Sequence, residues 1–404
     1  MQSEYIADAT FPVGRNIALL NGFSATRSAL FLLPVLVPYF GDHVGLSFRE
    51  TLLTEAAFAA TMVLTEVPSG WLADHWRRKN VLVLGAALWA AGCLCLWAAG
   101  GFAAVVVGQV LMGIAASLQS GADSALLYDS PLCTGAQSRY LRSESRRHGI
   151  AMVSLATASA LAGPLYVWDV DAIFALSTMA YLLSGIFAFA LVEPPRHRVY
   201  RGRFYLSAMI RVVLQECRYN RVVLWVVLFA GGLMAATKAS VWTQQAYLLL
   251  LKVDLFWFGP ITAAAFLVGG LVSQFGPSID RSIGARAALG IVVAGVVAGF
   301  ALGGSFPSTW MVPILFVAFA AYGIADPALK TLVNDRVSSD RRATILSVLS
   351  LVPQLTFVGL SPFVGRIVDD RGADSGYLFL ACFAAITAGA AWYGLARSLK
   401  SARA

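Results

Sequence analysis

Long apolar blocks, separated by short polar segments, run through most of this 404-residue chain. A helix that crosses a bilayer needs about 20 consecutive apolar residues, and with short connections the chain has room for about twelve. Hydrophobic residues make up 58% of the chain and charged residues 13%, against about 45–50% and about 25% in ordinary soluble proteins. The sequence therefore predicts an all-α polytopic membrane protein.

Twelve apolar segments can be delimited, and the longest connection follows the sixth. The first six predict an N-terminal six-helix bundle over 1–192, and the last six a C-terminal one over 221–404. The basic linker 193–220 ends in a predicted amphipathic helix, Phe204 to Tyr219, of the kind that lies in the membrane interface. The predicted spans are 15–40, 48–72, 80–100, 102–129, 146–168, 170–192, 221–250, 255–279, 286–305, 309–333, 342–368 and 376–396.

Basic residues are distributed unevenly between the two sides of these spans. With both termini in the cytoplasm, 24 of the 30 Lys and Arg residues lie in cytoplasmic segments and four in outward loops. This asymmetry follows the positive-inside rule, so we expect a multi-pass protein of a bacterial inner membrane with cytoplasmic termini. It also accounts for the net charge of +8, which therefore does not indicate a nucleic-acid partner.

The sequence has no His-Glu-x-x-His, no Gly-x-Ser-x-Gly and no phosphate-binding loop. An intramembrane hydrolase or a nucleotide-driven pump would use such motifs. The five cysteines have no metal-ligand spacing. We therefore expect no enzymatic activity, no metal and no cofactor.

The two halves of the chain share short motifs on corresponding spans. Three motif pairs are separated by 203 to 211 residues. Two pseudo-symmetric bundles of this kind are a transporter architecture, with substrate bound near the bilayer midplane. The pairs are Gly70-Trp-Leu-Ala-Asp74 with Gly276-Pro-Ser-Ile-Asp280, Ala25-Thr-Arg27 with Ala236-Thr-Lys238, and Ala122-Asp-Ser-Ala-Leu126 with Ala325-Asp-Pro-Ala-Leu329.

The segment from Gly70 to Lys79, GWLADHWRRK, resembles a signature of the major facilitator superfamily, G-x-L-A-D-[RK]-x-G-R-[RK]. A weaker copy, Asp280 to Arg286, lies where that family repeats it. The resemblance implies a secondary transporter that works by alternating access. Three further segments resemble its drug-exporter-like branch of drug:proton antiporters: Pro68-Ser69, Tyr128-Asp-Ser130 and Arg342 to Ser347.

The predicted function is proton-coupled export of small amphipathic organic molecules, including anionic or zwitterionic ones, by a monomer in the lipid bilayer. The fifth span keeps Gly163-Pro164 of the family's antiporter signature, but Ser159 and Tyr166 replace small residues. Two alternatives therefore stay open. One is a proton- or anion-coupled uptake carrier for an anionic metabolite, and the other is a substrate-sensing receptor on the same fold.

Charged residues at bilayer depth cost about 2.5–3.5 kcal/mol each on insertion scales and so indicate function. Arg27 lies 12 residues after Arg15, about 18 Å into the membrane, and Lys238 is its equivalent on the seventh span. The family resemblance implies that both spans line the central cavity. Two cations there favour a substrate with an acidic group. Trp242 and Gln245 follow on the face of Lys238 and complete the predicted substrate site.

Asp123 on the fourth span and Asp326 on the tenth form a symmetric acidic pair. In one interpretation they are fixed counter-ions, for Arg27 and Lys238 respectively. In the other they carry protons and compete with the substrate for those cations. Asp326 also lies four residues before Lys330, so a local ion pair is a further alternative.

Glu55 and Glu66 are additional candidates for proton coupling. They lie three helical turns apart on the second span and share a face. Glu66 precedes Pro68 close to the signature, which also suits a structural role. Glu55 lies nearer the outer side, where its side chain could reach water.

Asp74, Arg78 and Asp129 are expected to form a conformational latch, as the family resemblance implies. Asp74 would face the start of the eleventh span, and Arg78 would reach Asp129 at the end of the fourth. Such contacts would bias a two-state equilibrium and would not bind substrate. The alternative is a basic cluster that only sets the topology.

Overall fold

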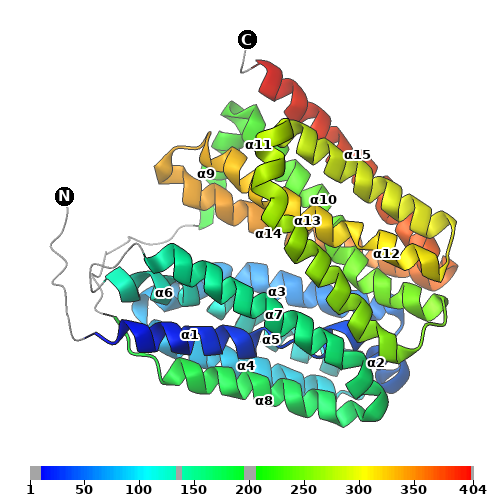
Figure 1. Ribbon diagram of the computed structural model, residues 1–404, viewed down its shortest axis with the longest axis horizontal. Helices are drawn as coiled ribbons and strands as arrows, with labels where there is room; N and C mark the ends of the chain where they lie inside the picture. The colour runs from blue at the N-terminus through cyan, green and yellow to red at the C-terminus, as the bar shows by residue number, and fades with distance from the viewer. Residues whose placement is uncertain (1–10, 133–138, 195–205, 402–404) are drawn as a thin grey trace. The chain divides into compact units, whose positions relative to one another are not determined.

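Uninterrupted runs of Ala, Leu and Val produce long helices along this chain. The computed structural model describes residues 11–132, 139–194 and 206–401, and this described part contains helices and turns but no strand (Figure 1). Within these described residues, ten helical segments are long and apolar enough to cross a membrane, and they confirm the third to the twelfth predicted spans. They are Arg78–Trp97, Phe102–Pro131, Arg142–Trp168, Val170–Phe189, Arg221–Leu250, Leu255–Gly276, Arg281–Ser305, Thr309–Asn334, Thr344–Arg371 and Ala373–Leu399.

The prediction of one continuous first span over 15–40 is wrong. Helix α1 (Val13–Arg27) ends at Arg27, and the chain continues through short turns that include α2 (Leu36–Tyr39). In a continuous helix Pro34 would have no N–H for the carbonyl of Leu30, and its ring would clash with that carbonyl. The carbonyl of Leu30 accepts instead from the N–H of Leu33 at 3.4 Å, so the helix that ends at Arg27 is not resumed through Pro34.

The second predicted span is α3 (Phe48–His75). Ser47 and Glu50 cap its start reciprocally, because the Ser47 N–H donates to the Glu50 carboxylate and the Glu50 N–H to the Ser47 hydroxyl. Asp369 accepts from the N–H groups of Phe48 and Arg49 at 3.0 and 2.9 Å. A carboxylate at this position also complements the positive end of the helix dipole.

The described residues group into two compact units. The first lies within 1–34 and 61–204, and in it α8 packs against α1 and α4, α4 against α5, and α7 against α1 (Figure 1). Besides α1 and the second half of α3, its helices are α4 (Arg78–Trp97), α5 (Phe102–Gln119), α6 (Ala122–Leu132), α7 (Arg139–Trp168) and α8 (Val170–Phe189).

The second unit lies within 35–60 and 205–404, and in it α10 packs against α14 and α15, and α11 against α13 and α15. Residues 35–60 thus group with the C-terminal helices, and the predicted division into 1–192 and 221–404 stays a prediction. Besides α2 and the first half of α3, its helices are α9 (Leu206–Tyr219), α10 (Arg221–Leu250), α11 (Phe258–Ser305), α12 (Val312–Leu315), α13 (Val317–Asn334), α14 (Ser339–Arg371) and α15 (Ala373–Ser401).

Two glycines with positive φ divide long helical stretches. Gly121 (φ +78°) separates α5 from α6 inside the fourth span, and Gly284 (φ +78°) turns the chain within α11, between the eighth and ninth predicted spans. Residues with a Cβ adopt this left-handed conformation only at a cost. The turn at Gly121 matters most here, because it sets where α6 begins.

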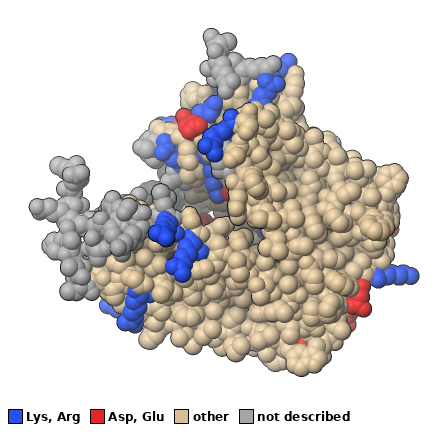
Figure 2. Space-filling model, in the orientation of Figure 1, with Lys and Arg blue, Asp and Glu red and all other residues tan. Residues whose placement is uncertain are grey.

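Large apolar side chains cover much of the outer helix faces. On α8, for example, Ile186 and Phe189 are exposed. Figure 2 shows wide uncharged areas with a few patches of Lys, Arg, Asp and Glu between them. Such a surface suits contact with lipid and not with water.

Candidate functional site

Asp123 is the centre of a charged cluster in the first unit. Helix α6 begins directly after the Gly121 turn, which places Asp123 in its first turn. Its Oδ2 accepts hydrogen bonds from Arg27 of α1 at 3.1 Å and from Arg147 of α7 at 2.5 Å. The contact expected between Arg27 and Asp123 is therefore present. The Asp123 side chain is 7% exposed, so these two cations compensate a buried carboxylate.

Arg147 is held from several sides. Glu144, one turn earlier on α7, accepts from its guanidinium at 2.7 and 3.1 Å. The hydroxyl oxygens of Ser124 and Ser24 lie at 3.1 and 3.4 Å from it. Together with the bond to Asp123, these contacts fix the guanidinium between α1, α6 and α7.

Arg27 and Arg147 therefore differ in environment. The Arg27 side chain is 31% exposed and the Arg147 side chain 13%. Arg27 also lies over the ring of Phe23, with 6.0 Å from the guanidinium carbon to the ring centre. Arg27 is consequently the more accessible of the two cations that share Asp123.

Arg147 was not among the residues that sequence reasoning selects. It lies in a basic segment at the start of a span, where the positive-inside rule accounts for cations. The sequence feature that could have indicated Arg147 is Glu144, three residues earlier, because it places a carboxylate on the same helix face.

Lys238 of α10 lies in a second cluster, in the second unit. Its ammonium donates to the side-chain oxygen of Gln354 and lies 4.6 Å from the ring centre of Phe357 and 6.0 Å from that of Phe58. The carboxylate of Glu55, a residue that is 5% exposed, acts on the ammonium electrostatically. Aromatic faces and a carboxylate both stabilise an ammonium in a desolvated place.

Asp326 does not pair with Lys238 among the described residues. It accepts from Lys330, one turn along α13, at 2.7 Å. This is the local ion pair, which needs no approach of a second helix because both residues lie on one helix face. The Lys330 side chain is 52% exposed, so the pair lies near the surface of its unit.

Trp242 and Gln245 lie on α10 after Lys238, and both are buried. The side-chain oxygen of Gln245 accepts from the backbone N–H of Val37 at 3.0 Å. Val37 belongs to the irregular continuation of the first span, where N–H groups have lost helical partners. Gln245 thus supports the interrupted backbone, a structural role that the sequence does not reveal.

Glu66 lies on the half of α3 that belongs to the first unit. The hydroxyl of Ser120 donates to its carboxylate at 3.4 Å. Ser120 immediately precedes Gly121, so Glu66 approaches the turn that positions Asp123.

The predicted contact between Arg78 and Asp129 is also present in the first unit. Arg78 begins α4, and Glu193 caps that helix by accepting from the N–H groups of Arg78 and Lys79 at 2.9 and 3.1 Å. Asp74 is exposed near the end of α3. Whether these residues act as a latch stays a prediction.

Both clusters compensate charges that lie between packed helices, Asp123 with two guanidiniums and Lys238 with Gln354 and aromatic rings. Ionisable groups at such positions are typical of binding sites and ion pathways in membrane carriers. Within 11–132, 139–194 and 206–401, no group of three or more His, Cys, Asp or Glu side chains could hold a metal ion. The helices and the two clusters together define a polytopic carrier.

The chain belongs to the Major Facilitator Superfamily, whose profile matches residues 18–358. It is therefore a multi-pass membrane transporter and not an enzyme. No curated protein matches the chain.

Solved structures with the same fold are distant in sequence. A mutant form of the nucleoside transporter NupG shares 13% identity at a TM-score of 0.81, over 94% of this chain and 99% of that one. A bacterial homolog of the human lysosomal transporter Spinster shares 16% at 0.74, over 99% of each chain. A mutant form of the peptide transporter POT, in complex with sulfate, shares 16% at 0.71, over 98% and 96%. At these identities the likeness shows the fold alone, and none of the three is described as a drug exporter.

Proposed function

We propose that this transporter carries a small organic molecule with an acidic group, and that Arg27 binds that group. The observation that supports this proposal is the double pairing of Asp123. Arg147 also binds this carboxylate, at 2.5 Å. The Asp123 carboxylate therefore keeps a cationic partner when Arg27 moves away from it.

Burial sets the energetics of this exchange of partners. Removing one partner of a buried ion pair costs about 3–5 kcal/mol, because the other charge is left uncompensated. A lone pair of Arg27 and Asp123 would carry that cost whenever substrate took the arginine. With Arg147 in place the carboxylate keeps a cation, so the more exposed guanidinium is available to form two parallel hydrogen bonds with a carboxylate or phosphate.

For coupling, we propose a proton site at Glu55. Protonation of Glu55 would remove the counter-charge of Lys238, which could then attract an acidic substrate group. Asp123 is less suited to this role because it has two guanidinium partners, and Asp326 because its pair with Lys330 lies near the surface. Glu66 is the competing proton site.

This coupling binds a proton and the acidic group together, so we propose their co-transport, which under an inward proton gradient is uptake of an anionic metabolite. Export in exchange for protons is the alternative, on the three segments that resemble the drug-exporter-like branch, Pro68-Ser69, Tyr128-Asp-Ser130 and Arg342 to Ser347. A proton gradient imposed on vesicles in either direction decides between them. Co-transport predicts accumulation of substrate when the exterior is acidic, and antiport predicts accumulation when the lumen is acidic.

A ligand-stabilisation screen tests the substrate class. Purified protein would be heated with organic anions, zwitterions and cationic drugs, in the wild type and in Arg27→Gln. We expect acidic compounds to raise the melting temperature of the wild type and to lose this effect in Arg27→Gln. Lys330→Gln, which removes a cation near the surface of the second unit, serves as the control and should respond like the wild type. Stabilisation by cationic drugs alone would contradict the proposal.

A further inference from the structure

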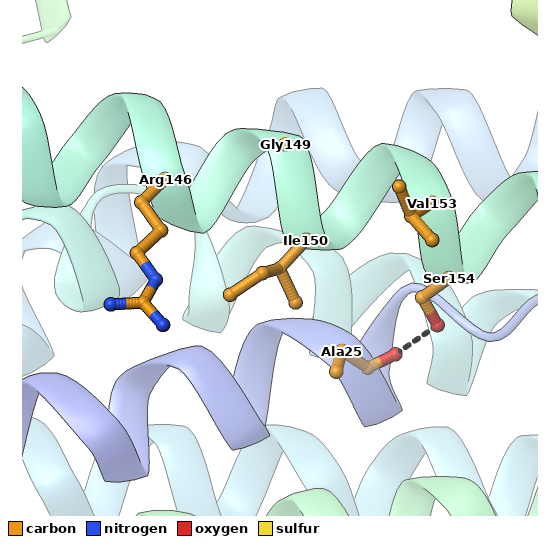
Figure 3. Close-up of a pocket in the computed structure, with 6 residues that line it drawn as sticks. All are labelled: Ala25, Arg146, Gly149, Ile150, Val153 and Ser154. Carbon is orange, nitrogen blue, oxygen red and sulfur yellow. Dashed lines mark hydrogen bonds between the residues drawn. The ribbon is translucent and has the colours of Figure 1, made fainter.

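A groove of about 460 Å³ lies between α1 and α7 in the first unit (Figure 3). Its size is within the range of about 300–1,000 Å³ that small-molecule sites occupy. At one end the hydroxyl of Ser154 donates to the carbonyl of Ala25 at 2.5 Å and ties the two helices together. At the other end the side chain of Arg146 extends from α7 toward α1. The lining residues are Ala25, Arg146, Gly149, Ile150, Val153 and Ser154.

Arg146 is the only charged residue of this lining. Its neighbour Arg147 is bound to Asp123 and Glu144, whereas no carboxylate of the described residues forms an ion pair with Arg146, which is exposed. Adjacent residues on a helix point about 100° apart, so the groove and the Asp123 cluster lie on different faces of α7. The groove therefore offers one uncompensated guanidinium beside an apolar wall.

We propose that this groove binds one anionic phospholipid, with its phosphate on Arg146 and an acyl chain along Ile150 and Val153. Arg146 lies four residues inside the candidate span that begins at Arg142, which is about 6 Å along the helix. Basic pockets between membrane helices, near the membrane surface, bind anionic headgroups in this way.

The apolar wall favours a lipid over a soluble anion. Val153 is 66% exposed, and Met152 and Leu161 on the same helix are also exposed. Exposed apolar side chains on a membrane span match a hydrocarbon chain, whereas a free phosphate would gain nothing from them. A lipid bound here would add to the bond between Ser154 and Ala25 in holding α1 against α7.

Native mass spectrometry of the purified full-length protein tests the charge. Dioleoyl-phosphatidylglycerol and dioleoyl-phosphatidylcholine would be titrated against the wild type, Arg146→Gln and Arg142→Gln. We expect the tightest phosphatidylglycerol site to weaken about fivefold in Arg146→Gln and to stay unchanged in Arg142→Gln, which removes an exposed cation of the same helix outside the groove. Equal weakening in both variants would overturn the proposal, because diffuse charge attraction would then explain the binding.

A second variant tests the apolar part while Arg146 stays in place. Gly149 is helical and has open space around the position of a Cβ, so Gly149→Phe fills the groove without backbone strain. We expect it to abolish the tightest phosphatidylglycerol site. Unchanged lipid binding in this variant would show that the groove is not used. Inorganic phosphate that displaced phosphatidylglycerol at equal concentration would also overturn the proposal, since a headgroup contact alone would then suffice.

Discussion

At the scale of single residues, the two arginines on Asp123 make a quantitative prediction about stability. Arg147→Gln takes from Asp123 the closer and more buried of its two cations and leaves Glu144 without this ion pair, so its unfolding free energy should fall by up to about 3–5 kcal/mol. Arg27→Gln leaves Asp123 paired with Arg147, so the loss should stay near that of an exposed pair, about 0–1 kcal/mol. Denaturant unfolding of both variants in detergent measures the difference. Equal losses would contradict the unequal roles of the two arginines, and adding Asp123→Asn should partly restore Arg147→Gln.

The proposed proton site at Glu55 predicts the pH dependence of substrate binding. In the wild type, acidic ligands should bind more tightly as the pH falls, because protonated Glu55 leaves Lys238 without its counter-charge. Glu55→Gln imitates the protonated form, so binding should be tight at all pH values and flat against pH. Isothermal titration between pH 5 and 9 measures this. Loss of the pH dependence in Glu66→Gln, and its persistence in Glu55→Gln, would move the proton site to Glu66.

The contacts of a site residue could be predicted only where the sequence indicated a single partner for it. The family resemblance implies that the spans of Arg27 and Asp123 line one cavity, and these two residues form the expected bond. For Lys238 the repeat suggests Asp326 as the partner. Asp326 pairs instead with Lys330, four residues later on the same helix, because this contact needs no approach of a second helix. Residues far apart in sequence, such as Glu55 and Gln354, reach Lys238 through packing that no periodicity encodes.

At the scale of elements, the turn at Gly121 predicts a local effect on the Asp123 cluster. Gly121→Ala places a Cβ in a left-handed conformation, at a cost of roughly 1–2 kcal/mol, and should lower the melting temperature. It should also reduce ligand stabilisation, because α6 begins at this turn. Gly389→Ala is the matched control, since Gly389 is helical with open space around it, and should be neutral. Equal melting temperatures for both variants would contradict a strained turn.

The linker helix α9 predicts the reactivity of its cysteine. Glu216 binds Arg341 at 2.5 Å and so ties α9 to α14. Burial, followed by the nearby Glu216 charge, raises the pKa of the Cys217 thiol. With Cys217 as the sole cysteine, maleimide labelling should therefore be slow at pH 7 and speed up as the pH rises. Arg341→Gln should accelerate labelling by releasing α9, and an unchanged rate would contradict this contact.

The helices themselves were largely predictable, since ten of the twelve spans follow from apolar runs alone. The interruption of the first span after Arg27 was not predictable. A hydropathy pattern registers Pro34 and Pro38 only slightly, whereas their missing N–H groups disfavour a continuous helix. The same backbone explains the hydrogen bond from the Val37 N–H to Gln245, and the predicted role of Gln245 in substrate binding stays a prediction.

At the scale of the whole molecule, the repeated motifs and the signature from Gly70 to Lys79 were sufficient to predict the transporter fold. The substrate and the direction of transport do not follow from that fold, which carries many different molecules. Distant structures with this architecture transport nucleosides and peptides. The chemistry of this chain must therefore be inferred from its own charged clusters.

The most direct test of the account is counterflow in proteoliposomes with an acidic ligand from the stabilisation screen. We expect the wild type to exchange labelled ligand across the membrane, Arg27→Lys to retain part of the rate because the charge remains, and Arg27→Gln to lose exchange while it stays folded. Lys330→Gln should exchange at the wild-type rate. Exchange by Arg27→Gln at the wild-type rate would contradict the central claim, and Arg27 would then be a packing ion pair only.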